Sequence, residues 1–241
     1  MKTVVEIVAR AGSHGRTALP IVRAGGQFAV RRTGPAAVHL VATAFGPLGG
    51  DDAEVRLVVE EGASLTVRSV AAAVALPCRG PSRASAQRIR ASVEGTLHLA
   101  LEPTVLAARA HHLAELTVEL GPDGNLTAIE QVLLGRTGED PGRWSGTTRI
   151  ERNGAPVLHT TVGLGPGEPA WLPPVTPRAY ASLVQLDSGN TGDDDEVRTG
   201  EDAVRLPLPG GWVATAWGAE LHRVVRAAEE IAAPAGFRAS A

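Results

Sequence analysis

Two glycine-rich stretches each hold an acidic residue where it could do chemistry. The first is Gly46-Pro47-Leu48-Gly49-Gly50-Asp51-Asp52, and the second runs from Gly135 to Trp144 with Glu139 near its middle. Glycines allow positive φ and a close backbone approach, so we expect both carboxylates at tightly specified turns. Neither stretch has the Gly-x-x-x-x-Gly-Lys pattern of a phosphate loop. Two carboxylates roughly 5–10 Å apart in a cleft could instead hydrolyse a glycosidic bond.

The same acids also have a structural interpretation. Asp51 and Glu139 could cap their turns or pair with arginines, for instance Glu139 with Arg136 or Arg143. In some proteins the acidic residues at strained turns belong to a functional site, and in others they only stabilise the turn. Both interpretations stay open from the sequence.

Histidines are the second group of candidate ligands. His111 and His112 are adjacent, and neighbouring residues on a strand point to opposite faces, so at most one of them could join a given site. His98 and His159 lie in other strand-like segments, which leaves a composite metal site open. No His-x-His or Cys-x-x-Cys spacing supports such a site, and ordinary strand or surface histidines are the simpler interpretation.

Two further features have simple explanations. Cys78 stands beside Arg79, whose charge could lower the thiol pKa, but a lone cysteine is more often an incidental thiol, and it excludes an internal disulfide framework. The run Asp193-Asp194-Asp195-Glu196 is contiguous, whereas a calcium loop spaces its ligands at alternate positions. We expect a solvated loop there.

Global composition excludes several classes of protein. The 241 residues carry a formal net charge of −3 without a basic run, so there is no electrostatic footprint for nucleic acid. No segment approaches the ~18 apolar residues of a membrane span, and the N-terminus lacks the apolar segment of a secretory signal. These features predict a soluble, cytoplasmic protein without a nucleic-acid or membrane partner.

Alternating strand patterns dominate up to about residue 165. Val55–Glu60 and Ser64–Arg68 flank the turn Glu61-Gly62-Ala63, and similar segments flank Glu94-Gly95, Gly121–Asn125 and Asn153-Gly154. Acid-Gly and Asn-Gly turns between alternating segments are the signal for β-hairpins. The turns recur about every thirty residues, which indicates stacked sheet layers. The prediction is a mainly all-β protein with a layered, β-helix-like or β-sandwich-like body.

The last third of the chain has a different pattern. We expect a single domain over 1–241, with the β body at about 1–170, a Pro/Gly/Asp-rich loop region at 171–210 and a short C-terminal α-helix at about 217–233. Apolar residues from Leu221 to Ile231 follow helical spacing. This amphipathic helix could dock on a partner or pack on the protein's own sheet.

The order of these motifs, over about residues 20–232, resembles the urease accessory protein D family (UreD, also called UreH). The resemblance rests on a Gly-Gly-Asp turn, a strand end with proline and a Gly-Arg-x-x-x-Gly-Glu-type motif, followed by a strand, turn and strand over 149–158 and by a terminal Gly-Trp and helix. The motif-turn residues are Gly49, Gly50, Asp51, Glu102, Pro103, Gly135, Arg136, Gly138 and Glu139. The segment 67–74 departs from the family's Thr-rich strand.

The resemblance implies a β-helix-like protein with no catalytic activity of its own. Family members act as scaffolds: they bind accessory protein F, which recruits the GTPase accessory protein G, and they dock on apo-urease. Nickel passes through their interior toward the urease active site, so the resemblance implies no tightly bound cofactor and nickel only in transit. A transit path needs weak oxygen ligands, and Asp51 and Glu139 would supply such transient contacts.

Two other hypotheses stay open from the sequence. The first is a β-helical carbohydrate-active enzyme or lectin that uses Asp51 and Glu139 as paired acids. The second is a stable nickel-binding chaperone that uses His98, His111 or His112. Tight, stoichiometric nickel binding by the isolated protein would favour the second over transit.

Overall fold

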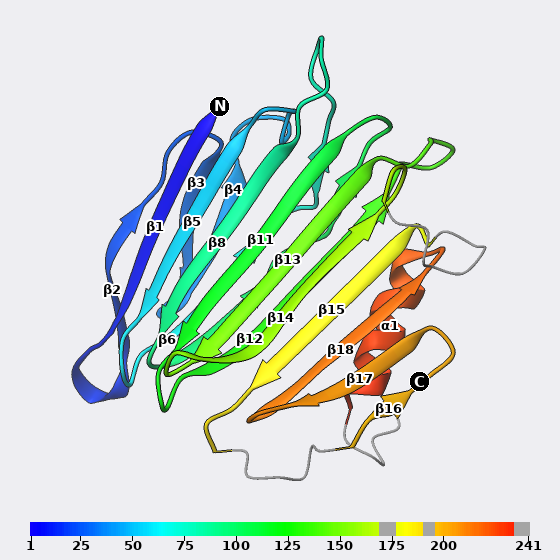
Figure 1. The fold of residues 1–241 in the computed structure, drawn as a ribbon. Coiled ribbons are helices and arrows are strands. Elements are labelled where there is room, and N and C mark those ends of the chain that lie inside the picture. Colours follow the sequence, from blue (N-terminus) through cyan, green and yellow to red (C-terminus); the bar gives the residue numbers. More distant parts are fainter. Residues whose placement is uncertain (169–176, 190–195, 234–241) are drawn as a thin grey trace.

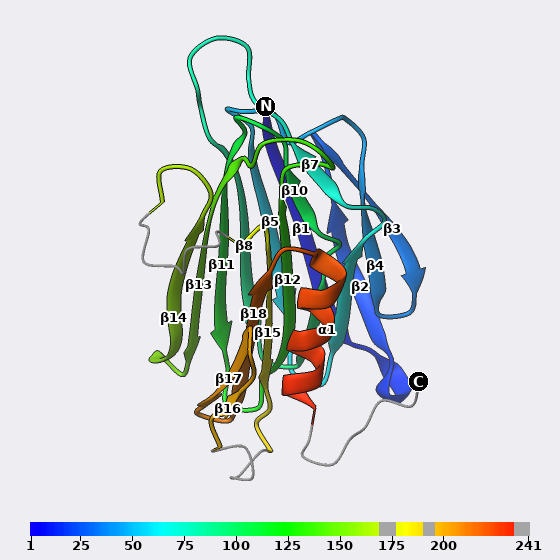
Figure 2. The same ribbon diagram turned by 90° about the vertical axis from the view of Figure 1, so that its right-hand side faces the viewer.

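Two β-sheets packed face to face form the body of the protein, and an α-helix covers part of one of them (Figures 1 and 2). The computed structural model describes residues 1–168, 177–189 and 196–233. A short 3-10 turn covers Ser13–Gly15, and α1 spans Leu221–Ala232. The mainly all-β prediction with a C-terminal helix is therefore confirmed.

Sheet A has seven strands within the described residues. They are β1 (Lys2–Ala11), β2 (Thr17–Arg23), β5 (Asp52–Val59), β8 (Ser85–Val93), β11 (His111–Leu120), β13 (Arg143–Arg152) and β14 (Ala155–Leu164). Their order is β14-β13-β11-β8-β5-β1-β2. The pairs between β13 and β1 are parallel, and β2 and β14 pair antiparallel at the two edges.

Sheet B contains the remaining described strands. They are β3 (Phe28–Gly34), β4 (Ala37–Ala42), β6 (Ser64–Ser69), β7 (Ala73–Ala75), β9 (Thr96–Ala100), β10 (Thr104–Leu106), β12 (Asn125–Leu134), β15 (Ala179–Leu186), β16 (Arg198–Thr199), β17 (Ala203–Leu208) and β18 (Gly211–Gly218). The main path runs β16-β17-β18-β15-β12-β9-β6-β4-β3, while β10 pairs with both β12 and β7.

The chain crosses between the sheets at stacked corners, which gives the body its β-helix-like character. Strands β5, β8 and β11 lie in sheet A, and the strands that follow them, β6, β9 and β12, lie in sheet B. The Thr96 N–H donates to the Ala63 carbonyl at 3.0 Å, and the Asn125 N–H donates to the Gly95 carbonyl at 2.8 Å. A Cβ on Gly95 would lie 2.1 Å from the Ala63 oxygen. Each recurring turn is therefore a corner between two successive coils of the β-helix-like body.

The hairpin interpretation of those turns holds at one place and fails at three. Asn153-Gly154 joins β13 and β14 as an antiparallel hairpin, as predicted. The turns at Gly62, Gly95 and Gly121–Asn125 instead separate strands of different sheets. The alternating pattern is the same in both cases, because it indicates which face of a strand is buried and does not indicate which other strand it pairs with.

The core lies between the sheets and follows the alternation of the strands. In β5, Val55 and Leu57 are buried while Glu54 and Arg56 face outward, as period-2 geometry requires. The main cluster of buried aliphatic residues spans both sheets. A second cluster surrounds Trp144, whose ring centroid lies 5.6 Å from that of Tyr180.

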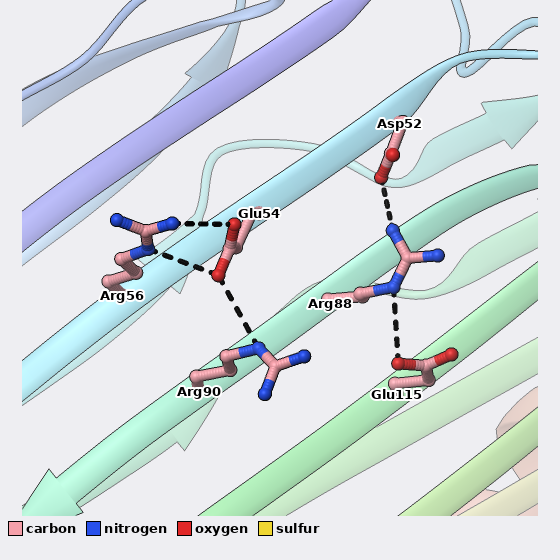
Figure 3. Close-up of polar contacts among 6 residues, drawn as sticks. All are labelled: Asp52, Glu54, Arg56, Arg88, Arg90 and Glu115. Carbon is pink, nitrogen blue, oxygen red and sulfur yellow. Dashed lines mark hydrogen bonds and ion pairs between the residues drawn. The ribbon is translucent and has the colours of Figure 1, made fainter.

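The outer face of sheet A carries a ladder of ion pairs (Figure 3). Glu54 pairs with Arg56 at 3.0 Å along its own strand and with Arg90 at 3.4 Å across to β8. On the same face, Arg88 pairs with Glu115 at 3.2 Å and also with Asp52. Exposed pairs of this kind contribute little to stability, so the ladder mainly keeps this face polar and its charges balanced.

The C-terminal helix packs on the protein's own sheet. Val224 and Ala228 are buried against small side chains of β15, β17 and β18, among them Ala181 and Ala216. Of the two roles considered for the amphipathic helix, the structure shows this one. Within the described residues, no helix is long and apolar enough to cross a membrane.

Boundaries in the C-terminal part differ from the prediction. The helix begins at Leu221 and not at about 217, because Trp217 is still part of β18 and pairs with Tyr180. The region 171–210, predicted as loop, contains β15 and β17. Most of the acidic run, Asp193 to Asp195, lies outside the described residues.

Candidate functional site

The Gly-Gly-Asp turn fastens a long loop to the end of the body. The Gly49 N–H donates to the Leu76 carbonyl at 2.9 Å, and the Gly50 N–H donates to the Ala84 carbonyl at 3.1 Å. These bonds fix both ends of the loop 76–84, which projects beyond the sheets (Figures 1 and 2). A Cβ on Gly49 would lie 2.6 Å from the Arg83 carbonyl oxygen, so the close approach requires glycine here.

Asp51 is held inside this turn. Its Oδ2 accepts a hydrogen bond from the Leu48 N–H at 2.9 Å, and its Oδ1 contacts the N-terminal ammonium of Met1. Burial is the largest single influence and raises the Asp51 pKa, but the hydrogen bonds from Met1, Leu48 and Gln27 and the charge of the Met1 ammonium lower it, and the net pKa lies below the usual value. Asp51 is therefore an ionised, turn-stabilising carboxylate.

Glu139 plays a similar part in the second turn. Its two carboxylate oxygens accept hydrogen bonds from Arg136 Nε and an Arg136 terminal nitrogen, each at 2.8 Å, and the Arg136 backbone N–H donates at 3.1 Å. The Arg136 side chain, followed by its backbone N–H, lowers the pKa of Glu139 to about 2. Of the two arginines considered from the sequence, Arg143 pairs instead with Glu168, at 2.5 Å.

Arg178 holds the second turn from outside, and sequence reasoning missed it. It lies just before β15, and its side chain donates to the carbonyls of Leu134 at 3.0 Å, Glu139 at 2.9 Å and Arg136 at 3.4 Å. Since about forty residues separate Arg178 from this turn, no local pattern links them. Each predicted acid thus has hydrogen-bond partners in its own turn, and Asp51 also has Met1; both turns lie at the end of sheet A where β5 and β13 begin.

An apolar groove lies between β3, β4 and the segment 69–74. It has a volume of about 540 Å³, and its walls include Phe28, Leu40 and Val74. Phe45 is 94 % exposed and Val70 61 % exposed at its edge. Exposed apolar surface of this kind marks sites of interaction.

The groove continues toward a small cavity between the two sheets. Four residues line both: Gln87, Leu101, Glu102 and Thr104. The cavity measures about 70 Å³, which is room for a few water molecules. The structure therefore places the predicted residue Glu102 at the junction of groove and cavity, and the Pro103 carbonyl next to it accepts a hydrogen bond from the Ala73 N–H at 2.9 Å.

Besides Glu102 and Glu115, two further titratable residues line this cavity. His112 is 2 % exposed, its Nδ1 lies 2.9 Å from the Ser85 hydroxyl, and its pKa is lowered to about 4 by burial and, less, by His111. Burial raises the pKa of Glu130 to about 7. Sequence reasoning missed Glu130, although a single acid at the inward position between Ala128 and Val132 of a strand pattern was a readable signal.

The remaining predicted ligands are not gathered. His111 and His112 point to opposite faces as expected, and His98 is exposed on β9. No group of three or more His, Cys, Asp or Glu side chains that could hold a metal occurs in the described part of the chain. The Cys78 thiol donates to the Pro81 carbonyl at 3.2 Å inside the loop 76–84.

The fold is thus a β-helix-like body with an apolar surface groove that leads to a small cavity containing a few polar groups. Neither Asp51 nor Glu139 lines the groove or the cavity. The family model described as UreD urease accessory protein matches residues 6–233. The chain thus belongs to the UreD urease accessory protein family, whose members are not enzymes. This assignment replaces the carbohydrate-active alternative.

Individual relatives carry the same family name. The chain is 35 % identical to urease accessory protein UreD of Frankia alni over 221 residues, 83 % of this chain and 74 % of the relative. Identity to the UreD of Streptomyces coelicolor is 33 % over 222 residues, 87 % of each chain. A shorter match, 41 % over 134 residues, covers 55 % of this chain and 52 % of UreD 1 of Saccharopolyspora erythraea.

Proposed function

We propose that this chain is a scaffold of urease maturation in the cytoplasm. In this proposal it binds accessory protein F, which recruits the GTPase accessory protein G, and it docks on apo-urease. Family membership over residues 6–233 supports the proposal. The exposed apolar side chains of Phe45 and Val70 at the groove are surface of the kind that a partner covers.

Nickel is the cargo that the scaffold passes on. The observation that carries this step is the shared wall of the groove and the inter-sheet cavity, because it joins the surface to polar groups inside the body. Glu102 stands at the junction, and Glu130 and His112 stand inside. One or two oxygen or nitrogen ligands at a time bind nickel weakly enough for it to move on.

The charge of Glu130 suits a transient contact. With a pKa of about 7, roughly half of the Glu130 side chains are ionised at neutral pH. Because a metal binds the deprotonated carboxylate, a nickel ion and a proton compete for this position. Neutral His112, with its pKa of about 4, offers a nitrogen without adding positive charge.

Asp51 and Glu139 remain predicted as nickel contacts. Their carboxylates already bind Met1 and Arg136 in the described structure. If Asp51→Ala combined with Glu139→Ala leaves urease activation intact in an assembled complex, the prediction for these two residues is wrong.

The experiment measures the nickel content and activity of urease matured with variant scaffolds. Glu102→Gln and Glu130→Gln each keep the size of the side chain and remove its charge, and Glu61→Gln is the control, because Glu61 is an exposed corner residue. We expect assembled complexes in every case, with less nickel in urease for the first two variants, most of all when combined. Full nickel loading by the combined variant would refute transit through the cavity without touching the scaffold role.

A further inference from the structure

A second concave site lies at the end of the body where β8, β11 and β13 begin. This cleft has a volume of about 440 Å³ and is formed by the loops that precede those three strands. It shares no lining residue with the apolar groove or the inter-sheet cavity. The family assignment and the nickel proposal give it no role.

Positive charge gathers in this cleft. Arg83, Arg109 and Arg143 all line it, and no Asp or Glu does. Glu168 pairs with Arg143 at 2.5 Å, whereas no described residue forms an ion pair with Arg83 or Arg109. On a chain of net charge −3, Arg83 and Arg109, which have no ion-pair partner among the described residues, give this concavity a local positive potential.

Backbone hydrogen bonds hold the loop that carries Arg109. Arg109 has a φ of 61°, a left-handed conformation that is uncommon for a residue with a side chain. The Ala110 N–H donates to the Ala107 carbonyl at 3.0 Å, and the Arg143 N–H donates to the Ala110 carbonyl at 2.8 Å. Bonds within the loop and to β13 therefore hold the unusual backbone conformation of Arg109 and join its loop to the start of β13.

The imidazole of His111 lines the wall of the cleft, close to the charge of Arg143. The ring is half-buried, and its pKa is lowered first by burial and next by the charge of Arg143, with Glu168 acting weakly in the opposite direction. An anion seated among the arginines would lie next to this ring, so the ring is a natural reporter of anion binding.

We propose that this cleft binds a small oxyanion, of phosphate or carboxylate chemistry, that carries two or more negative charges. The planar guanidinium fork matches both kinds of oxyanion. The Ser82 hydroxyl, which also lines the cleft, adds a donor. The volume lies in the range of small-molecule sites and exceeds what a single atomic ion needs.

The test follows the imidazole signals of histidine-labelled full-length protein by NMR. Inorganic phosphate and citrate are titrated separately at constant ionic strength, which distinguishes a phosphate site from a carboxylate site. We expect a saturable shift of the His111 signals with at least one of the two anions, while the signals of the exposed His98 and His159 stay unchanged.

Matched variants decide whether the arginines are responsible. Arg83→Ala with Arg109→Ala should weaken binding roughly tenfold or more, as the loss of charge-assisted hydrogen bonds implies. Arg149→Ala removes the same charge from an exposed position on β13 and should bind like the unmodified protein. Arg83 and Arg109 are exposed, so the variants should fold normally. A shift shared by all histidines, an unsaturable shift, or equal binding by both variants would overturn the proposal.

Discussion

Replacing Glu130 with glutamine tests whether a desolvated carboxyl group lies in the cavity between the sheets. Glu130 lies on the face of β12 that carries Ala128 and Val132, and this face packs toward sheet A. Burial raises its pKa from 4.5 to about 7. Glutamine has the same shape and cannot ionise, so the substitution removes the charge and leaves the packing.

The sign of the effect follows from the raised pKa. A carboxyl group with a higher pKa in the folded state binds its proton more tightly there, so ionisation favours the unfolded chain. Wild-type stability is unaffected below pH 4.5, falls as the pH rises from there to about 7, and then stays at the lower level. At about 1.4 kcal/mol per pKa unit, the cost above pH 7 is at most roughly 3 kcal/mol. Water in the cavity reduces it, so we expect about 2 kcal/mol.

Urea unfolding across the pH range measures this cost. Glu130→Gln should be about 2 kcal/mol more stable than wild type near pH 8 and nearly equal to it near pH 5. His112 has the opposite dependence, since its lowered pKa of about 4 destabilises the fold as the pH falls below 6.5; it is present in both proteins, so its contribution cancels. A difference that does not change with pH would refute the reasoning that Glu130 is desolvated.

Two further predictions concern the framework around the site. Gly95→Ala places a Cβ 2.1 Å from a backbone carbonyl of the preceding coil, so it should lower the free energy of urea unfolding by roughly 3 kcal/mol. The control is Gly25→Ala, which has open space around its Cβ and should leave this free energy unchanged. Equal effects of the two substitutions would contradict the stacked corners. Arg178→Ala removes three hydrogen bonds to carbonyl oxygens and should cost about 2 kcal/mol. In this variant, amide hydrogen exchange should be faster in the glycine-rich turn after β12, whereas the control variant Arg149→Ala should exchange like wild type. Unchanged exchange in Arg178→Ala would show that the turn is stable without Arg178.

The sequence predicted the strands better than their partners. Alternation located Val55–Glu60 and Ser64–Arg68 within three residues of the ends of β5 and β6, and the recurrence of turn glycines indicated stacked layers. The partners of β5 are β1, about fifty residues before it, and β8, about thirty residues after it, and pairing over such distances leaves no local signal. The strand β15 was missed because the residues around it are rich in Pro, Gly and Asp, although Ala179–Leu186 itself is apolar.

Among the functional residues too, local contacts could be predicted from the sequence and long-range contacts could not. Pairing of Glu139 with Arg136 could be read from a spacing of three residues, and the structure confirms it. Arg178 reaches that turn only through tertiary packing, so it could not be predicted. Glu102 was identified from its motif, but its place between groove and cavity depends on tertiary packing, since residues from many strands line both.

Co-expression with the accessory protein F homologue and with apo-urease, followed by affinity pull-down and size exclusion, tests the central claim most directly. A scaffold of urease maturation should co-elute with protein F as one defined complex, and that complex should then bind apo-urease. A chain that folds well but elutes alone in the presence of both partners would contradict the account, and family membership would then describe ancestry and not activity.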